Sequence, residues 1–311
     1  MITLVQYSPY NKEEWNNFIT ISKNGLFLFD RDYMEYHHSR FQDHSLLFYK
    51  KDRLIATFPA NISNNILYSH AGLTFGGFIM DRSLQTNDIL AIFKELLQYS
   101  KEQQISCIRY KAIPSIYHTI PSEEDRYALY LQGGRLIQRD LSTSINFSEP
   151  LQVSPSRMRK IKQAEKKGLM VREDNNYREF WNILENNLKK KYHKKPVHTL
   201  EEICYLKKLF PDNIRLFACY ENNQIVSGAV VYESRNVAHI QYNASSDRGR
   251  QLSALDLVIS HLITSIFVKK RYFDFGISTE EMGRIFNSDL VFYKESFGAR
   301  AIVHDTYELI V

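Results

Sequence analysis

The residues with the clearest chemical potential lie in one stretch near the C-terminus, 271–300. Its pattern predicts a buried strand that carries Asp274 and stops at Gly276, then a polar loop, then a helix that carries Lys294 in its last turn and ends on Gly298. Because a sheet fixes geometry while the loop at its end supplies chemistry, this arrangement predicts a site. The alternative is purely structural, with Gly276 as a turn, Gly298 as a helix cap and Lys294 as a solvated cation.

A second segment, 154–168, is rich in arginine and lysine. Ser154 is a plausible N-cap, Pro155 fits the first helical position, and Gly168 ends the predicted helix. This helix is either a solvated linker or an anion-binding surface, and its place between the two halves of the chain keeps both open. Its cations are Arg157, Arg159, Lys160, Lys162, Lys166 and Lys167.

Composition limits the class of protein. The chain has 311 residues, enough for one large domain or two of ordinary size, and 44% of them are hydrophobic, which suffices for a core. A net charge of +5 is compatible with a phosphorylated or anionic ligand. It falls well short of a nucleic-acid-binding signature, so we expect no DNA partner.

Cysteine usage and apolar runs indicate the compartment. Cys107, Cys204 and Cys219 lack paired spacing, which argues against a disulfide framework and a zinc site and fits a reducing compartment. The N-terminus has no signal-peptide pattern, and the longest apolar run, 257–268, is too short to span a bilayer. We therefore expect a soluble, cytoplasmic protein with no metal site and no transmembrane segment.

The elements that would position these residues follow a repeated order. The first half predicts strand 2–7, helix 10–21, an irregular aromatic stretch 26–41, hairpin 45–60, strand 65–69, turn 71–78, helix 87–103, strand 107–111, helix 125–132 and strand 139–147. The second half predicts strand 169–174, helix 177–190, hairpin 214–232, strand 237–243, polar loop 244–250, helix 252–269, strand 272–275, the helix through Lys294 and strand 301–310.

The only two tryptophans, Trp15 and Trp181, sit at matching places in the two halves. LVQYSPYNKEEW ends at the first and MVREDNNYREFW at the second, and the hairpins, helices and strands that follow keep the same order. This common order predicts two copies of one α/β unit. We predict a first domain over 1–148, a basic linker helix over 149–168 and a second domain over 169–311.

Each copy resembles the GNAT acyltransferase fold, a mixed twisted sheet flanked by helices, which implies an α/β protein with two tandem GNAT-like domains. In that fold two neighbouring parallel strands splay apart, the acyl thioester inserts between them, and a helix N-terminus cradles the pyrophosphate of the donor. The equivalent strands here are 237–243 and 271–276, and the helix begins near Leu252. The preceding loop, SSDRGRQLSA, has Gly249 but lacks the second glycine of the family pattern.

Three segments extend the resemblance to the Fem-type peptidoglycan aminoacyltransferases and the broader FemAB-like acyltransferases. They are SRMRKIKQAEKKGLMVRE, YFDFGIS and FYKESFGA. Lys294 stands four residues before Gly298, where GNAT enzymes often have a tyrosine, whereas Tyr130 holds the corresponding place before Gly134. The second half lacks the long helical pair of the aminoacyl-tRNA users, so the resemblance favours acyl-CoA as the co-substrate over aminoacyl-tRNA.

The resemblance implies roles for individual residues. Lys294 would stabilise the oxyanion that forms when an amine attacks an acyl ester or thioester, or would hold a phosphate or carboxylate of the acceptor. Asp274 is the candidate general base, with Asp289 and Glu280 behind it. Its structural alternative is a strand-end carboxylate bonded to loop amides. The candidate substrate-binding residues are Arg157, Arg159, Lys160, Tyr242, Asn243, Ser278, Asn287, Tyr293 and, in the first copy, Tyr130.

The implied function is an N-acyltransferase of the GNAT-like, FemAB-like kind. It would move an acyl or aminoacyl group, from acyl-CoA in the first instance, to an amine of a cell-envelope or amino-sugar precursor. The first copy would be degenerate and shape the acceptor groove, and the second would hold the donor. Two alternatives are a Fem-type enzyme that uses aminoacyl-tRNA and a non-catalytic module that binds an anionic ligand.

Overall fold

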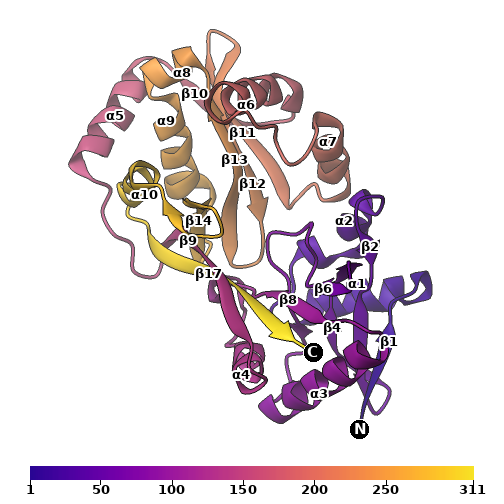
Figure 1. Cartoon of the computed structure of the whole chain (residues 1–311). Helices are drawn as coiled ribbons and strands as arrows, with labels where there is room; N and C mark the ends of the chain where they lie inside the picture. Colours follow the sequence, from indigo (N-terminus) through magenta and orange to yellow (C-terminus); the bar gives the residue numbers. More distant parts are fainter. The chain divides into compact units, whose positions relative to one another are not determined.

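The computed structural model describes residues 1–311, the side chain of Tyr192 excepted, and divides into two compact units (Figure 1). The first unit comprises Met1–Leu141, Thr279–Ile285 and Val303–Val311, and the second comprises Ser142–Ser278 and Phe286–Ile302. The first unit thus includes two segments from the C-terminal part of the chain. The sequence boundaries 1–148, 149–168 and 169–311 follow the repeat instead and stay a prediction.

The first unit contains two sets of strands. One set is ordered β1-β3-β4-β7 and the other β17-β8-β6-β5-β2, with β6 and β8 parallel. These strands are β1 (Ile2–Gln6), β2 (Gln42–Asp43), β3 (Leu46–Lys50), β4 (Arg53–Phe58), β5 (Asn61–Ser63), β6 (Ile66–Tyr68), β7 (Ile79–Met80), β8 (Cys107–Lys111) and the end of β17 (Arg300–Ile310). The start of β9 (Arg135–Asn146), the short β15 (Thr279–Glu280) and the start of β16 (Ile285–Phe286) also belong here.

The helices of the first unit cover an aromatic core. Buried Phe48, Phe58, Phe78, Phe93 and Tyr110 pack together in it. The helices are η1 (Pro9–Asn11), α1 (Lys12–Ile21), η2 (Phe27–Phe29), α2 (Arg31–Met34), η3 (Glu35–His37), α3 (Thr86–Glu102), η4 (Ser115–Tyr117) and α4 (Glu124–Leu131). The long elements lie where the sequence predicts them, because their apolar periodicity is regular.

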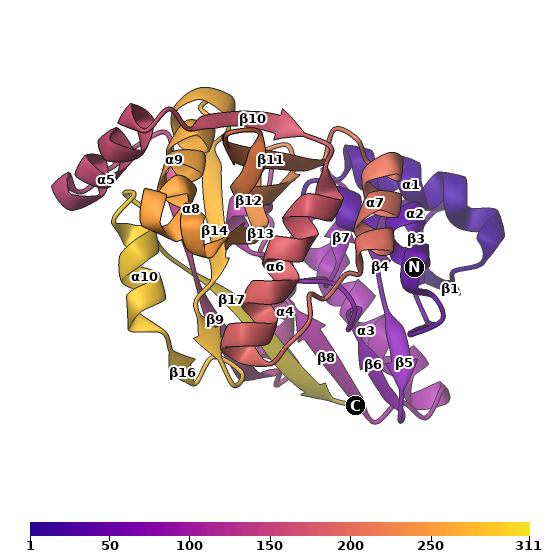
Figure 2. The same cartoon turned by 90° about the horizontal axis from the view of Figure 1, so that it is seen from above.

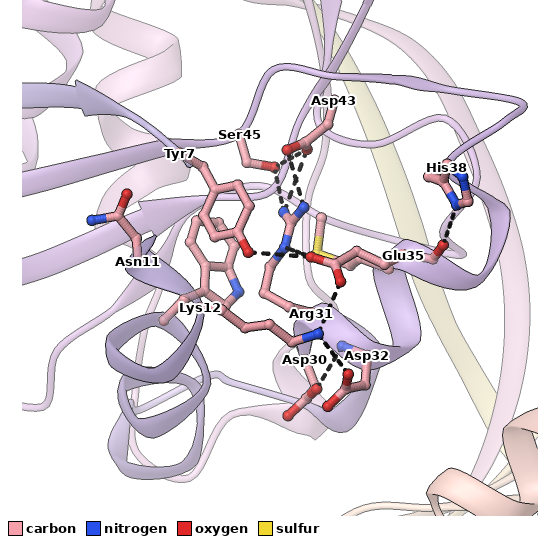
Figure 3. Close-up of polar contacts among 12 residues, drawn as sticks. Tyr7, Asn11, Lys12, Asp30, Arg31, Asp32, Glu35, His38, Asp43 and Ser45 are labelled. Carbon is pink, nitrogen blue, oxygen red and sulfur yellow. Dashed lines mark hydrogen bonds and ion pairs between the residues drawn. The ribbon is translucent and has the colours of Figure 1, made fainter. Parts of the chain in front are cut away.

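The stretch predicted as irregular, 26–41, instead forms the three short helical turns η2, α2 and η3. Arg31, which is buried, holds them in place (Figure 3). Its guanidinium donates to Glu35 at 3.2 Å, to Asp43 at 3.0 Å and to Ser45 at 3.2 Å, and lies 3.7 Å from the centre of the Tyr7 ring. Since its carboxylate, hydroxyl and aromatic partners all come from this unit, Arg31 serves the fold.

The second unit is built on a sheet in the order β10-β11-β12-β13-β14, followed by the end of β9. Only the pair β13 and β14 is parallel; the other pairs among these strands are antiparallel. The strands are β10 (Met170–Asp174), β11 (Ile214–Glu221), β12 (Gln224–Glu233), β13 (Val237–Ser245) and β14 (Tyr272–Ile277). The helices are α5 (Pro155–Lys166), α6 (Tyr177–Tyr192), α7 (Leu200–Leu209), α8 (Asp247–Leu252), α9 (Ala254–His261), the π-helical turn η5 (Leu262–Ile266) and α10 (Ser288–Glu295).

Both faces of this sheet are covered, which explains why β12 is buried along nearly its whole length. Ala229 and Val231 face the core that α5 and α9 complete. Gly228 faces the other way, where a β-carbon would lie 2.9 Å from the ring of Phe180 on α6. The helix α6 packs against β12 and β13, as Figure 2 shows.

Two predictions for the second unit are wrong. Residues 244–250 are not a loop, because β13 runs to Ser245 and α8 begins at once, with the Ser246 hydroxyl accepting from the Gly249 amide. The helix predicted to begin near Leu252 therefore starts earlier and breaks at Ser253, whose φ is +58°. The helix α7 was not predicted, although Thr199 and Glu202 form a capping box at its start.

The predicted basic helix is confirmed as α5, with Pro155 at its start and the Ser154 hydroxyl accepting from the Arg157 amide. Across the part of the chain that the structure describes, none of the helices combines the length and the apolar character needed to cross a membrane.

Candidate active site

The strands β13 and β14 form a fork. They pair in parallel over three positions, from Val237–Tyr272 to His239–Asp274. Beyond that point β13 continues to Ser245 and β14 to Ile277, but the two strands do not pair with each other again. The expected pair of neighbouring parallel strands that separate is therefore confirmed, and Asp274 lies at the last paired position.

A β-bulge at Gln241 directs the side chains of β13 beside the fork. On β12, Tyr232 faces His239, and Val230 faces Tyr242, so one extra residue of β13 lies between the two pairs. Because Tyr232 and Val230 share a face of the sheet, His239 and Tyr242 share it too. Asp274 lies on this same face, since it stands directly beside His239.

Asp274 and His239 form a buried pair. The Asp274 side chain is 0% exposed, and its Oδ2 accepts from His239 Nδ1 at 2.6 Å while its Oδ1 accepts from Ser142 Oγ at 2.7 Å. A carboxylate can only accept, so Nδ1 carries the hydrogen and Nε2 of a neutral His239 carries a lone pair. The imidazole also lies against Gly276, where a β-carbon would be 3.4 Å from its Cε1. These groups form an oriented imidazole at the fork.

Lys294 lies at the end of β14. It is 4% exposed, and its Nζ donates to Gly276 O at 2.6 Å, Ile277 O at 3.0 Å and Ser278 Oγ at 2.7 Å. Desolvation lowers the pKa of Lys294 to about 8, although the negative charge of Asp274 acts in the opposite direction. The structural alternative of a solvated cation is therefore wrong. All three N–H groups of the ammonium are in use, and they hold the last two residues of β14 and Ser278, which follows them.

Two further predicted residues, Ser278 and Asn287, lie beside Lys294. Asn287 caps α10 by accepting from the Leu290 amide at 3.0 Å, and its own amide donates to Ser278 O at 3.1 Å. The structure thus brings Lys294, Ser278, Asn287 and Asp274 together around the end of β14, where the sequence predicts a site.

Arg157 and Tyr293 take part in a separate buried cluster. Arg157 donates to Asp256 at 2.6 Å and to Ser296 at 2.9 Å, and its guanidinium lies 4.3 Å from the centre of the Tyr293 ring. The Tyr293 hydroxyl donates to Asp256 at 2.9 Å. Burial and the neighbouring Asp256 raise the pKa of Tyr293 well above its ordinary value. This cluster joins α5, α9 and α10.

The remaining predicted residues lie on surfaces or at the edge of the fork. Arg159 and Lys160 are exposed on α5, and Asn243 is exposed on β13. Tyr242 contacts Trp181 with a ring separation of 5.1 Å and shares a hydrogen bond with His198. Tyr130 belongs to the first unit, on α4, and is 76% exposed.

Sequence analysis missed His239. Its partner Asp274 is 35 residues away, and nothing in the spacing of HIQYN indicates that the two side chains meet. Only the register between β13 and β14, which packing sets, brings them together.

Comparison of the sequence with family descriptions matches residues 156–293 to a family described as "Acetyltransferase (GNAT) domain". This segment includes α5, the fork and most of α10. A search of curated proteins found no relative by sequence.

Solved structures share the fold over nearly the whole chain. FemX superposes with a TM-score of 0.70 at 10% identity, covering 99% of this chain and 97% of that one. L-PGS from Bacillus licheniformis gives a TM-score of 0.62 at 12% identity and covers 98% and 92%. A tandem GNAT protein from the clavulanic acid biosynthesis pathway gives 0.53 at 7% identity and covers 99% and 98%. The chain therefore has a Fem-like tandem GNAT fold, with its GNAT acetyltransferase match in residues 156–293.

Proposed function

We propose that this protein transfers an acyl or aminoacyl group from an activated donor to an amine, and that the reaction takes place at the fork between β13 and β14. The observation that carries the proposal is the His239–Asp274 pair at the last position where these parallel strands meet. The GNAT match over 156–293 and the Fem-like fold support the same reaction class.

His239 is the general base of this reaction. An amine nucleophile must lose a proton as its nitrogen attacks the acyl carbon, and Nε2 of His239 accepts that proton. Asp274 holds Nδ1–H by a 2.6 Å hydrogen bond and stabilises the imidazolium that forms. The new C–N bond replaces the bond from the acyl carbon to its leaving group, which takes up the proton on departure. Asp274, the base that the sequence suggests, thus acts through His239.

Lys294 supports the same step from the end of β14. Its hydrogen bonds to Gly276 and Ile277 fix the backbone that follows Asp274. Because the ammonium is buried, its charge is poorly screened and lowers the energy of an oxyanion that forms at the fork. Ser278 and Asn287 line this end of β14 and orient the substrate.

Acyl-CoA is the favoured donor, and the acceptor is an amine on a small molecule or a cell-envelope precursor such as an amino sugar. The Fem-like fold keeps aminoacyl-tRNA as the alternative donor, and the proposed place of work is the cytoplasm. In this scheme no metal takes part. The remaining alternative is a non-catalytic module that binds an anionic ligand.

The test is turnover by His239→Gln. The purified protein is incubated with acetyl-CoA or longer acyl-CoAs and a panel of amines, and both free CoA and acylated amine are measured by mass spectrometry. Glutamine keeps a polar side chain of similar size but removes the base, so we expect kcat to fall about 10²- to 10⁴-fold while the protein stays folded. His261→Gln, on α9 and outside the fork, is the matched control.

Turnover that His239→Gln leaves unchanged contradicts the role of the pair. Absence of turnover with every acyl-CoA and with charged tRNA contradicts acyl transfer itself and favours the binding module.

A further inference from the structure

The strand β1 is an edge of the sheet ordered β1-β3-β4-β7 in the first unit. It pairs with β3 in the antiparallel direction and with no other described strand. Val5, in the middle of β1, is 39% exposed. An edge strand of this kind presents unpaired backbone N–H and C=O groups along its outer side, and another strand can bind there.

The ladder between β1 and β3 shows which backbone groups point outward. Just beyond β1, the Tyr7 amide donates to Ser45 O at 2.8 Å, so these two residues form a hydrogen-bonded pair. Hydrogen-bonded and non-hydrogen-bonded pairs alternate along an antiparallel ladder. The residues of β1 whose N–H and C=O groups point away from β3 are therefore Ile2, Leu4 and Gln6. Among the described residues, none bonds to the backbone of these three on the outer side.

The other edge strands of the described sheets are protected against pairing with a second chain. The strands β2, β7, β15 and β16 are two residues long. The longer edge strand β10 carries three charged side chains, of which Arg172 pairs with Asp174 at 3.2 Å and Glu173 with Arg215 at 2.7 Å. Short edges and charged edges both oppose pairing between chains. The five residues of β1, ITLVQ, have neither protection and contain no proline.

The outer side of β1 is complementary to a second copy of itself. When two copies of β1 run antiparallel with Leu4 opposite Leu4, Ile2 of one copy lies opposite Gln6 of the other, and every outward N–H and C=O has a partner. Thr3 then lies opposite Val5 of the second copy. No like charges are opposed, because the strand is uncharged. Leu4, which is half-buried at the margin of the core, gains a contact with its own image.

We propose that two copies of this protein associate through β1, antiparallel about a two-fold axis at Leu4, so that their two sheets become one continuous sheet. Five residues a side are fewer than the roughly 20–30 of a standard stable interface. The dimer is therefore in reversible equilibrium with the monomer. The surface belongs to the first unit, so the inference does not depend on the reaction proposed for the fork.

The test is a charge exchange on β1, followed by sedimentation velocity. Protein concentrations from about 1 µM to about 1 mM cover the affinities of weak interfaces. We expect the parent to shift from monomer to dimer across this range. Thr3→Lys/Val5→Lys places like charges opposite one another across the two-fold axis and is expected to weaken the dimer at least tenfold, as is Thr3→Glu/Val5→Glu. Both positions are exposed, so each variant should fold, which its melting temperature checks.

An equimolar mixture of the two double variants is expected to form the dimer again, because each new ammonium then faces a carboxylate. The control Asn17→Lys/Thr20→Lys adds the same charge at exposed positions of α1 and should dimerise as the parent does. As an independent check, Gln6→Pro removes one outward N–H and leaves the bonds to β3 in place, so it should also weaken the dimer.

A parent that stays monomeric up to about 1 mM overturns the inference. A dimer that survives the lysine and glutamate variants unchanged uses another surface and overturns it as well. Loss of the dimer in both variants without recovery in their mixture contradicts the pairing of β1 with its own copy. Recovery in the mixture, together with a weaker dimer in Gln6→Pro, supports both the surface and the register.

Discussion

At the scale of single residues, burial changes what the ionisable groups of the site can do. Lys294 gives up its hydration and receives three oxygen acceptors in exchange, and its pKa falls to about 8. Asp274 is fully buried yet bonded to two donors, His239 and Ser142. Buried polar groups of this kind are retained only where each has a partner, and here the partners also fix the direction of the imidazole.

The depressed pKa of Lys294 predicts a pH dependence of stability. The pKa is about 8 in the folded protein and 10.5 in the reference state, so between these values the unfolded chain binds more protons. The contribution of this group to the free energy of unfolding therefore rises with pH across that window, by up to about 3 kcal/mol. In Lys294→Met this rise is expected to disappear. Urea denaturation at several pH values from 7 to 10.5 measures it.

The exposed Lys162→Met serves as the control and should keep the rise of the parent. Parallel pH curves for the parent and Lys294→Met contradict a depressed pKa.

At the scale of elements, a buried ion pair helps to fix the basic helix α5 of the second unit. Arg157 reaches from α5 to Asp256 on α9 and to Ser296 just after α10. Its ring contacts with Tyr293 and Phe297 leave the guanidinium inside the fold. The helix α5 thus buries one of its cations, Arg157, and exposes the others.

Removing one partner of this pair should cost more than removing both. Arg157→Met leaves Asp256 buried without its cation, and we expect the free energy of unfolding to fall by about 3–5 kcal/mol. Arg157→Met/Asp256→Leu should recover part of that loss, because the uncompensated charge is gone. A double-mutant cycle by chemical denaturation gives the coupling, with the exposed Arg159→Met as a control expected within about 0.5 kcal/mol of the parent. A double variant no more stable than Arg157→Met contradicts this account.

At the scale of the whole molecule, the tandem fold is established, and the proposed donor site lies in the second unit. The arginines of α8, in the segment that precedes the donor helix in GNAT enzymes, are paired within the protein: Arg248 pairs with Glu221, and Arg250 pairs with Asp247. The segment 244–250 also lacks the second glycine of the GNAT family pattern.

We predict that acyl-CoA stabilises the protein. A ligand that binds only the folded state at 100 times its Kd adds about 2.7 kcal/mol to the free energy of unfolding. Thermal unfolding with acetyl-CoA, a longer acyl-CoA and charged tRNA compares the donor classes, and free CoA controls for binding without the acyl group. A shift with charged tRNA alone reverses the choice of donor.

Much of the architecture was predictable because its signals are local. Residues close in sequence suffice to predict the hairpins around short polar turns and the apolar periodicity of α3 and α6. They also suffice to predict that α5 starts at Ser154–Pro155. The break at Ser253 was not predictable, since tertiary packing rather than propensity places a serine at positive φ. The three short helical turns within 26–41 also depend on distant residues, because Arg31 holds them through Asp43 and Ser45.

By itself, the sequence predicted a Fem-like tandem GNAT fold, which the structure confirms, and a site on the stretch from Asp274 to Lys294, which stays a prediction. Only the tertiary structure decided that His239 is the partner of Asp274, that Lys294 is buried, and that Arg157 binds Asp256, which is 99 residues away. The physical reason is that the register of parallel strands depends on the helix that connects them and on the helices that pack on the sheet. A pattern of neighbouring residues carries no record of that packing.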